Sequence, residues 1–290
     1  MKKKSIINIG IIWILLLIAF STPQLISVKP VQALTKTSVI WGSNLGVDPV
    51  DNSEALGVIA YISPLFSGYS SPYNPYNGYD TLTTQNNVYA KTYITNHYYD
   101  YSVVFHTGHG FVYDDDVYDI KHYYLYSDDS ISPNDGIRDE DIYDRTGSKT
   151  HRFIFIWTCS QADEGVGSAY PTPHGMAHCW THKYMNSDGF HTPDSSFRVF
   201  IGFHEISPNL SETAGPYGYC YGNFIKYFYY FALYHHLNIH DSLNCASDWV
   251  YGVPFDQCEL WNGYYRPGMQ GEPVLSHMRV FGDSSMTLYY

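Results

Sequence analysis

Short apolar runs, separated by polar stretches rich in Gly, Pro, Ser, Asn and Asp, mark the strands expected in this chain. The runs lie at residues 38–41 (SVIW), 101–105 (YSVVF), 152–158 (RFIFIWT), 197–203 (FRVFIGF) and 277–281 (HMRVF). Apolar runs without strict alternation are typical of strands that are buried on both faces of a sheet. We therefore expect a central sheet that is covered on both sides.

Three other segments have the features of helices. Residues 223–237 are apolar almost all round, as in a buried helix, and begin at a capping Asn. Residues 241–251 begin at a capping Asp and end before Gly252, and residues 53–61 predict a shorter helix. Buried strands that alternate with helices predict an α/β fold, specifically a three-layer sandwich around a mostly parallel central sheet.

The N-terminal segment has the pattern of a secretory signal peptide. Lysines at positions 2 to 4 precede an apolar stretch at 11–20, and a small residue, Ala33, follows at a suitable cleavage site. We expect residues 1–33 to be removed from a secreted or cell-surface protein. An uncleaved N-terminal anchor is the alternative, and membrane attachment is expected only in that case.

The remainder, residues 34–290, is expected to form one domain. Its first part, residues 34–100, is either a pro-segment or the first strand and helix of the fold. The whole chain has 290 residues, of which 44% are hydrophobic and only 15% charged, which excludes a disordered chain. The formal net charge of −12 argues against a nucleic-acid partner, because phosphate binding needs a basic surface.

The chain has five cysteines, an odd number that leaves at least one thiol unpaired in a secreted protein. Cys159 stands apart because it ends an apolar run. The other four are expected to form two disulfides, with the pairing open: Cys179, Cys220, Cys245 and Cys258. Alternatively, Cys159 is bridged and another thiol is buried and inert.

Two chemically useful residues follow predicted strands. The run at 101–105 continues into His106, Thr107, Gly108, His109 and Gly110, and the run at 152–158 continues into Cys159. In a parallel sheet the carboxyl ends of strands lie at one edge, where ligands bind. Cysteine and histidine together are the minimal pair for nucleophilic acyl transfer, and flanking glycines permit close approach of a substrate.

A strand that ends in Gly-His-Gly, followed by a strand that ends in Cys159, resembles the caspase–hemoglobinase fold (clan CD) cysteine peptidases. The gingipain and clostripain groups are the nearest. The histidine precedes the cysteine by about 50 residues, as in the caspase signature. Residues 280–286 (VFGDSSM) are similar to the Gly-Asp-Pro-Ser strand of gingipain-like domains. The resemblance covers about residues 100–290.

The resemblance implies a secreted cysteine endopeptidase that cleaves protein or peptide substrates through a thioester acyl-enzyme. By the same resemblance, Cys159 is the nucleophile and His109 the acid and base, while the N–H groups of Gly110 and Cys159 form the oxyanion hole. No cofactor is required. The chain departs from the family pattern at Thr158 and Ser284. A non-catalytic binding domain on the same fold is therefore an alternative.

Acids near the strand ends are candidates for a substrate pocket, because a buried carboxylate is the usual partner of an Arg or Lys side chain. Phe203, His204 and Glu205 end the run at 197–203, and Asp163 follows the nucleophile. Glu205 is the acid that we expect first to set a preference for a basic residue at P1, the substrate residue before the cleaved bond.

Histidine spacing offers a competing interpretation based on zinc. His106 and His109 are three residues apart, and a zinc-dependent hydrolase that uses them is a further alternative function. His174, His178 and His182 would share one face of a helix. Nearby glycine and proline disfavour that helix, so we expect a polar stripe there.

Acid-rich stretches at 113–119 and 127–145 are expected to be loops, although residues 139–141 have the pattern of the acidic first turn of a short helix. Both stretches are weak candidates for calcium binding. The candidate ligands are Asp114, Asp115, Asp116 and Asp135. Several gingipain-like and clostripain-like enzymes use calcium, so the resemblance adds some support. Solvated surface acid is the simpler interpretation.

Overall fold

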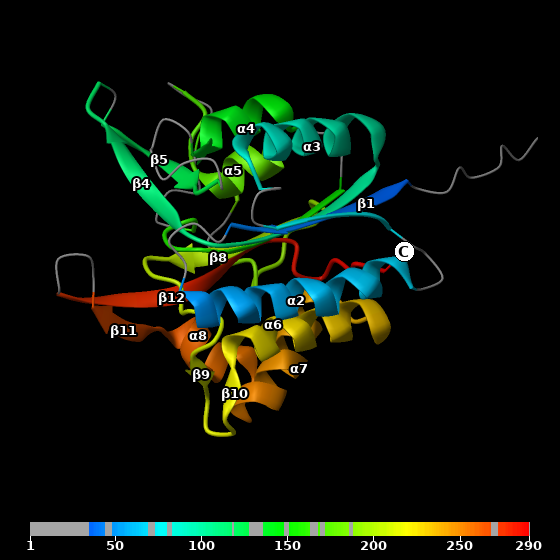
Figure 1. Ribbon diagram of the computed structural model, residues 1–290, viewed down its shortest axis with the longest axis vertical. Helices are drawn as coiled ribbons and strands as arrows, with labels where there is room; N and C mark the ends of the chain where they lie inside the picture. Colours follow the sequence, from blue (N-terminus) through cyan, green and yellow to red (C-terminus); the bar gives the residue numbers. More distant parts are fainter. Residues whose placement is uncertain are drawn as a thin grey trace, which may run out of the picture. The chain divides into compact units, whose positions relative to one another are not determined.

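The computed structural model describes most of the chain after the N-terminal segment (Figure 1). The described residues are 35–43, 48–68, 73–79, 83–117, 119–127, 136–147, 151–162, 168, 172–185, 188–267 and 272–289. The expected signal peptide, residues 1–33, lies outside them. The chain divides into two units, and the described residues belong to the second, Leu34–Tyr290.

A mixed seven-stranded sheet forms the centre of this unit, in the order β11-β12-β8-β7-β3-β1-β2. Its strands are β1 (Lys36–Gly42), β2 (Asn74–Tyr79), β3 (Tyr101–Thr107), β7 (His151–Trp157), β8 (Arg198–His204), β11 (Tyr264–Pro267) and β12 (Pro273–Gly282). The pairings from β2 to β8 are parallel, whereas β12 pairs antiparallel with both β8 and β11. All five apolar runs of the sequence fall in these strands, apart from the end residues Thr158 and Phe197, so the strand predictions are confirmed.

Helices cover both faces of the sheet (Figure 1). One layer contains α2 (Pro49–Ser67), α6 (Tyr221–Tyr229), the π-helix η3 (Tyr230–Tyr234) and α7 (Ile239–Tyr251). The other contains α3 (Gln85–Tyr98), α4 (Asp139–Arg145) and α5 (Met176–Thr181). The short η4 (Phe255–Gln257) and α8 (Glu259–Asn262) follow α7. The three predicted helices are found in α2, α6 with η3, and α7.

The region before residue 100, whose role the sequence left open, supplies β1, α2, β2 and α3. Strand β1 lies between β3 and β2, with Lys36 paired to Tyr101 and Gly42 to Thr107. This region is therefore built into the central sheet. Within the part of the chain that the structure describes, no helix is both long and apolar enough to cross a membrane.

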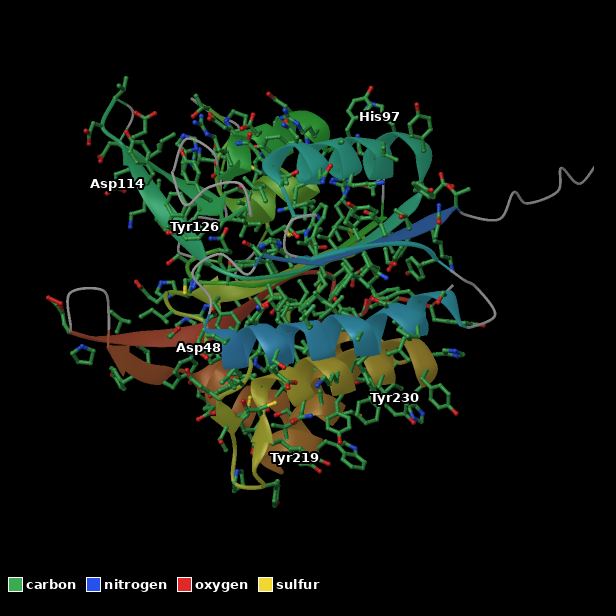
Figure 2. The ribbon with its side chains drawn as sticks, in the orientation of Figure 1. Asp48, His97, Asp114, Tyr126, Tyr219 and Tyr230 are labelled. Carbon is green, nitrogen blue, oxygen red and sulfur yellow. The ribbon has the colours of Figure 1, made fainter. Side chains whose placement is uncertain are left out.

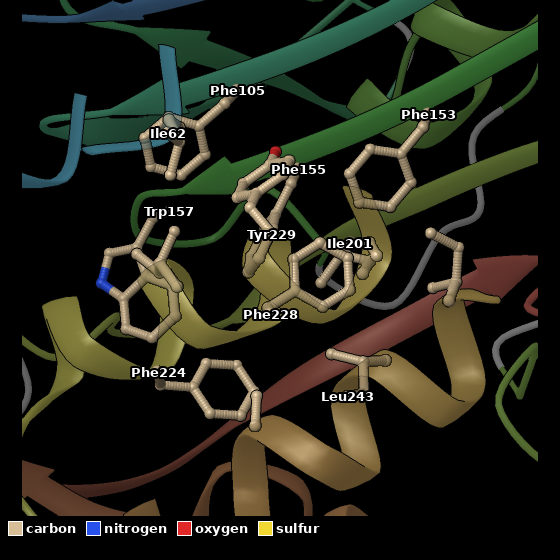
Figure 3. Packing of buried hydrophobic residues seen from close by; sticks show 14 of the residues in the cluster. Ile62, Phe105, Phe153, Phe155, Trp157, Ile201, Phe224, Phe228, Tyr229 and Leu243 are labelled. Atoms are coloured by element: carbon tan, nitrogen blue, oxygen red, sulfur yellow. The ribbon is translucent and has the colours of Figure 1, made fainter. Parts of the chain in front are cut away.

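The larger core lies between the sheet and the layer of α2, α6 and α7 (Figure 3). Aromatic rings dominate it: Phe153 stacks on Phe228 with centroids 5.5 Å apart, and Phe105 meets Tyr229 edge-on at 5.9 Å. Alternate strand residues face the opposite core, so successive residues of β3 and β7 are divided between the two layers. Side chains at successive positions near the strand ends therefore point to opposite faces of the sheet.

Two small sheets complete the unit. One contains β4 (Gly110–Asp115), β5 (Ile120–Leu125) and β6 (Ile137–Arg138), and the other contains β9 (Thr213–Ala214) and β10 (Tyr219–Cys220). The expectation of loops at 113–119 and 127–145 is thus partly wrong. Interleaved aromatic residues make the β4–β5 hairpin a strand pair, with Phe111 stacked on Tyr124 at 4.7 Å.

The expected disulfides are absent, because all five cysteines are free thiols. Cys179 lies in α5 and is buried in the core on one face of the sheet, whereas Cys258 belongs to the core on the opposite face. The Cys220 thiol donates to Asn223 Oδ1 at 3.2 Å, and Cys245 lies within α7. The sequence showed the number of thiols but could not show that the sheet separates Cys179 from the others.

Candidate active site

The ends of β3 and β7 bring the predicted cysteine and histidine into one pocket. These strands are adjacent and parallel, and Thr107 is paired with Trp157, so the residues that follow each strand emerge side by side. His109 and Cys159 both line a pocket of about 280 Å³. The other lining residues are Asp48, Asp51, Thr107, Gly108, Trp157, Ile206, Ser207, Pro208 and Asn209.

The glycines that flank His109 are required by close backbone contacts. A Cβ atom on Gly110 would lie 2.8 Å from the carbonyl oxygen of Cys159 and 2.9 Å from Thr158 Oγ1. Gly108 has φ +146° and lies against Ser43, so a larger residue would be strained there. Gly110 thus lets the histidine loop pack directly on the loop that carries Cys159, and Gly108 lets it pack against the residue that follows β1.

Tyr126 and the first turn of α2 surround His109. The backbone N–H of Tyr126 donates to the His109 carbonyl at 3.0 Å, and the two rings lie edge to face with centroids 5.8 Å apart. Asp48 caps α2 by accepting from Val50 N at 2.8 Å; Figure 2 labels Asp48 at the start of this helix. The helix therefore begins at the wall of the pocket.

Asp51, one turn further along α2, is a partly buried carboxylate in the same wall. It accepts a hydrogen bond from Ser211 N at 2.9 Å. Burial raises the pKa of Asp51 above its ordinary value, and hydrogen bonds from residues 210 and 211 and the nearby charge of His109 oppose that shift. Among the described residues, the pocket wall therefore carries two carboxylates and one imidazole.

Cys159 lies in a tight turn after β7. The next residue, Ser160, has φ +57°, and its N–H donates to the carbonyl of Glu205 at 2.6 Å. The Cys159 sulfur lies 3.7 Å from the Ser207 hydroxyl. Trp157 Nε1 donates to the carbonyl of Pro208 at 2.8 Å. The end of β7 and the loop that carries Cys159 are thus joined to the segment that follows β8.

Three of the four residues predicted for the substrate pocket do not line the pocket that contains His109 and Cys159. Phe203 is fully buried in the larger core against Trp157, at 4.8 Å between centroids, and His204 stacks on His277 at 4.9 Å. Neither these two residues nor Glu205 line the pocket. Strand β8 ends at residue 204, and the part of the following segment that lines the pocket is residues 206–209. Asp163 lies outside the described residues.

Sequence reasoning missed Asp48 and Asp51. A usable signal was present: a capping Asp followed by Pro49 marks a helix start, and this helix follows the first strand. An acid at that point belongs to the edge of the sheet where the other strand-end residues meet. Reading 53–61 as the helix placed its start too late to include these acids.

His106 faces away from the pocket. It is paired in register with Trp41 and Ile156, which belong to the opposite core, and it is fully buried. Neither ring nitrogen has a partner among the described residues, and burial lowers the pKa of His106 to about 3. His106 therefore does not join His109 in a shared site, and the pairing expected for a zinc hydrolase is not formed.

The second histidine group packs around one tyrosine. His178 and His182 stack on Tyr143 with centroids 5.4 and 4.0 Å away. His174 lies before α5, where its Nδ1 is 2.8 Å from the carbonyl of Thr172. Because α5 covers only Met176–Thr181, the three histidines do not share one helix face. The rings of His178 and His182 therefore pack against α4, whereas the ring of His174 lies edge-on to His122 on β5, with centroids 6.3 Å apart.

The calcium candidates do not converge in the described structure. Asp114 and Asp115 lie on β4, Asp116 follows in the turn, and Asp115 Oδ1 accepts from Val117 N at 2.8 Å. Asp135 lies outside the described residues. Within the described ranges no group of three or more His, Cys, Asp or Glu side chains is arranged to hold a metal ion.

No protein-family model matches this chain, and no curated protein matches it. What the chain can do is therefore argued from the pocket itself. It combines a thiol, an imidazole and two carboxylates at the ends of neighbouring parallel strands. A thiol and an imidazole beside a cleft are groups that can supply the nucleophile and the proton carrier of acyl transfer.

Proposed function

We propose that this protein is a cysteine endopeptidase of the caspase-like fold that acts outside the cytoplasm. One observation carries the proposal: His109 and Cys159, 50 residues apart in the chain, line the same pocket. The four consecutive parallel pairings from β2 to β8, with helices on both faces, agree with the three-layer, mostly parallel architecture that the resemblance implies.

The proposed reaction follows from the chemistry of these two groups. His109 takes the proton of the Cys159 thiol, and the thiolate attacks the carbonyl carbon of the scissile peptide bond. The tetrahedral oxyanion is stabilised by backbone N–H groups, for which Gly110 and Cys159 are the candidates. His109 then protonates the leaving amine, and water hydrolyses the thioester to release the acid product and the free thiol.

The other thiols are poorly suited to this role. Burial raises the pKa of Cys179, Cys220, Cys245 and Cys258, and acidic neighbours add to this at Cys179 and Cys245. A raised pKa disfavours the thiolate, which is the reactive form. None of the four lines the pocket that contains His109.

The test is cleavage of a mixture of peptides with varied sequences by the purified protein, followed by mass spectrometry of the products. We expect cleavage by the native chain and by Cys245→Ala, which removes another half-buried thiol. We expect none from Cys159→Ala and a rate at least about 100-fold lower from His109→Ala. Equal cleavage by Cys159→Ala would overturn the proposal, and so would the absence of cleavage by the native chain. The latter result would favour a binding domain.

A further inference from the structure

The segment after β8 is fixed against the nucleophile loop at successive residues. The carbonyl of Glu205 accepts from Ser160 N at 2.6 Å, and the carbonyl of Pro208 accepts from Trp157 Nε1 at 2.8 Å. Residues 205–208 therefore form a strap along residues 157–160. Ser207 lies between the two attachment points.

The strap is also fixed from its other side. The carbonyl of Ile206 accepts hydrogen bonds from the hydroxyl of Tyr264, at 2.8 Å, and from the hydroxyl of Ser276. Burial raises the pKa of Tyr264, so its hydroxyl keeps its proton and remains a donor at neutral pH. Ser207 is thus flanked by two carbonyls whose positions are set by β11, β12 and β7.

The Ser207 hydroxyl lies 3.7 Å from the Cys159 sulfur, within hydrogen-bonding distance for sulfur. Only 9% of Ser207 is exposed, and both residues line the pocket that holds His109. We propose that Ser207 is a positioning residue for the nucleophile: its hydroxyl donates to the Cys159 thiolate and holds the sulfur toward the substrate. This inference rests on the proposed peptidase function and adds a third member to the cysteine–histidine pair.

The chemical reason is that a thiolate can only accept hydrogen bonds, and hydrogen bonds to charged acceptors are the stronger ones. Because the backbone around Ser207 is fixed, its hydroxyl can donate this hydrogen bond to the thiolate without a further loss of conformational freedom. When the sulfur bonds to the carbonyl carbon, its negative charge moves to oxygen and the hydrogen bond to sulfur weakens. Ser207 therefore acts on the free thiolate before attack, and not on the acyl-enzyme.

The test measures alkylation of Cys159 by iodoacetamide as a function of pH, read at the modified peptide by mass spectrometry. We expect Ser207→Ala to slow alkylation near pH 6 by about tenfold and to move the rate–pH curve to higher pH. Ser207→Thr keeps a hydroxyl and should restore most of the rate. Ser242→Ala removes a fully buried serine from α7, remote from the pocket, and should leave the curve unchanged.

The outcomes separate this inference from the proposed function. An unchanged or faster rate in Ser207→Ala would overturn the donated hydrogen bond even if the native chain cleaves peptides. A slower rate that Ser207→Thr does not restore would assign Ser207 a purely structural role and also overturn it. Because alkylation is measured directly on the thiol, the result holds whether or not peptide cleavage is detected.

Discussion

At the scale of single residues, the site depends on how closely two loops approach each other. Gly110 has no space for a side chain, because a Cβ would lie 2.8 Å from the Cys159 carbonyl. The side-chain amide of Gln161, whose Nε2 would lie 2.5 Å away, and the Cys159 carbonyl are the main obstacles there, so a larger residue must displace the loop that carries Cys159. The glycine that the sequence pattern linked to the oxyanion is thus also a packing requirement; its oxyanion role stays a prediction.

We predict that Gly110→Ala reduces peptide cleavage by about 100-fold or more, because a displacement of about 1 Å at a catalytic group is enough for such a loss. Cleavage rates of the purified variants measure this. Gly57→Ala is the control: Gly57 lies within α2, its Cβ would meet only Lys226 Nζ at 3.6 Å, and helix propensity favours alanine. Full activity in Gly110→Ala would show that the site does not depend on the close approach of the Gly110 loop to the Cys159 loop.

The candidate pair could be predicted from sequence because each residue directly follows a strongly apolar strand. Parallel strands end at the same edge of a sheet, so local pattern was sufficient for His109 and Cys159. The acids of the pocket wall, Asp48 and Asp51, depend on where a helix start docks, and Ser207 depends on the path of a loop beyond its strand. Such features are set by tertiary packing, which local patterns do not contain.

At the scale of elements, a buried carboxylate joins three of them. Asp139, at the start of α4, accepts from His122 Nδ1 on β5 at 2.9 Å and from Gly175 N, just before α5, at 2.7 Å. It also accepts from the backbone N–H of Tyr123. The hairpin that begins at Gly110, the helix α4 and the helix α5 are therefore held together by one side chain.

This junction predicts a pH-dependent contribution to stability. The hydrogen bond to Asp139 raises the pKa of His122, and burial partly opposes the shift. A raised pKa in the folded state means that the contribution is complete below the ordinary value near 6.5 and is lost as pH rises through the raised value. We expect His122→Gln to lower the free energy of unfolding by about 1 kcal/mol at low pH and by less at high pH.

Urea unfolding at several pH values measures this difference. His97→Gln is the matched control, since His97 is exposed on α3, and it should change neither the stability nor its pH dependence measurably. If His122→Gln lowered the free energy of unfolding by the same amount at every pH, this would contradict the ion pair between His122 and Asp139. The sequence could not show this junction, because it joins a hairpin that was expected to be a loop, the first turn of a short helix and the residue before α5, and local patterns do not bring such segments together.

At the scale of the whole molecule, the negative charge of the chain predicts a preference for cationic substrates. The chain has a net charge of −12, and the only described acids and bases that line the pocket are Asp48, Asp51 and His109. Acidic surroundings attract basic peptides and repel acidic ones. The expectation of a basic P1 residue therefore stands as a prediction, with different acids from the one that the sequence indicated.

We predict that kcat/KM is higher for peptides with Arg or Lys at P1 than for matched peptides with Asp or Glu. Asp51→Asn should reduce this ratio by about fivefold, the scale of one partly exposed ion pair. Asp248→Asn removes the same charge from the exposed surface of α7 and should leave the ratio unchanged. If the native chain and Asp51→Asn showed the same preference for basic P1 residues, Asp51 would have no role in substrate recognition.

The central claim is that Cys159 and His109 act together, and alkylation of Cys159 with and without the imidazole tests it most directly. The purified protein would be treated with iodoacetamide near pH 6 without reduction, and the modified cysteines read by mass spectrometry. We predict rapid labelling of Cys159 ahead of the four other thiols, and a rate at least about tenfold lower in His109→Gln. Equal rates in the two proteins, or preferential labelling of another cysteine, would contradict the account.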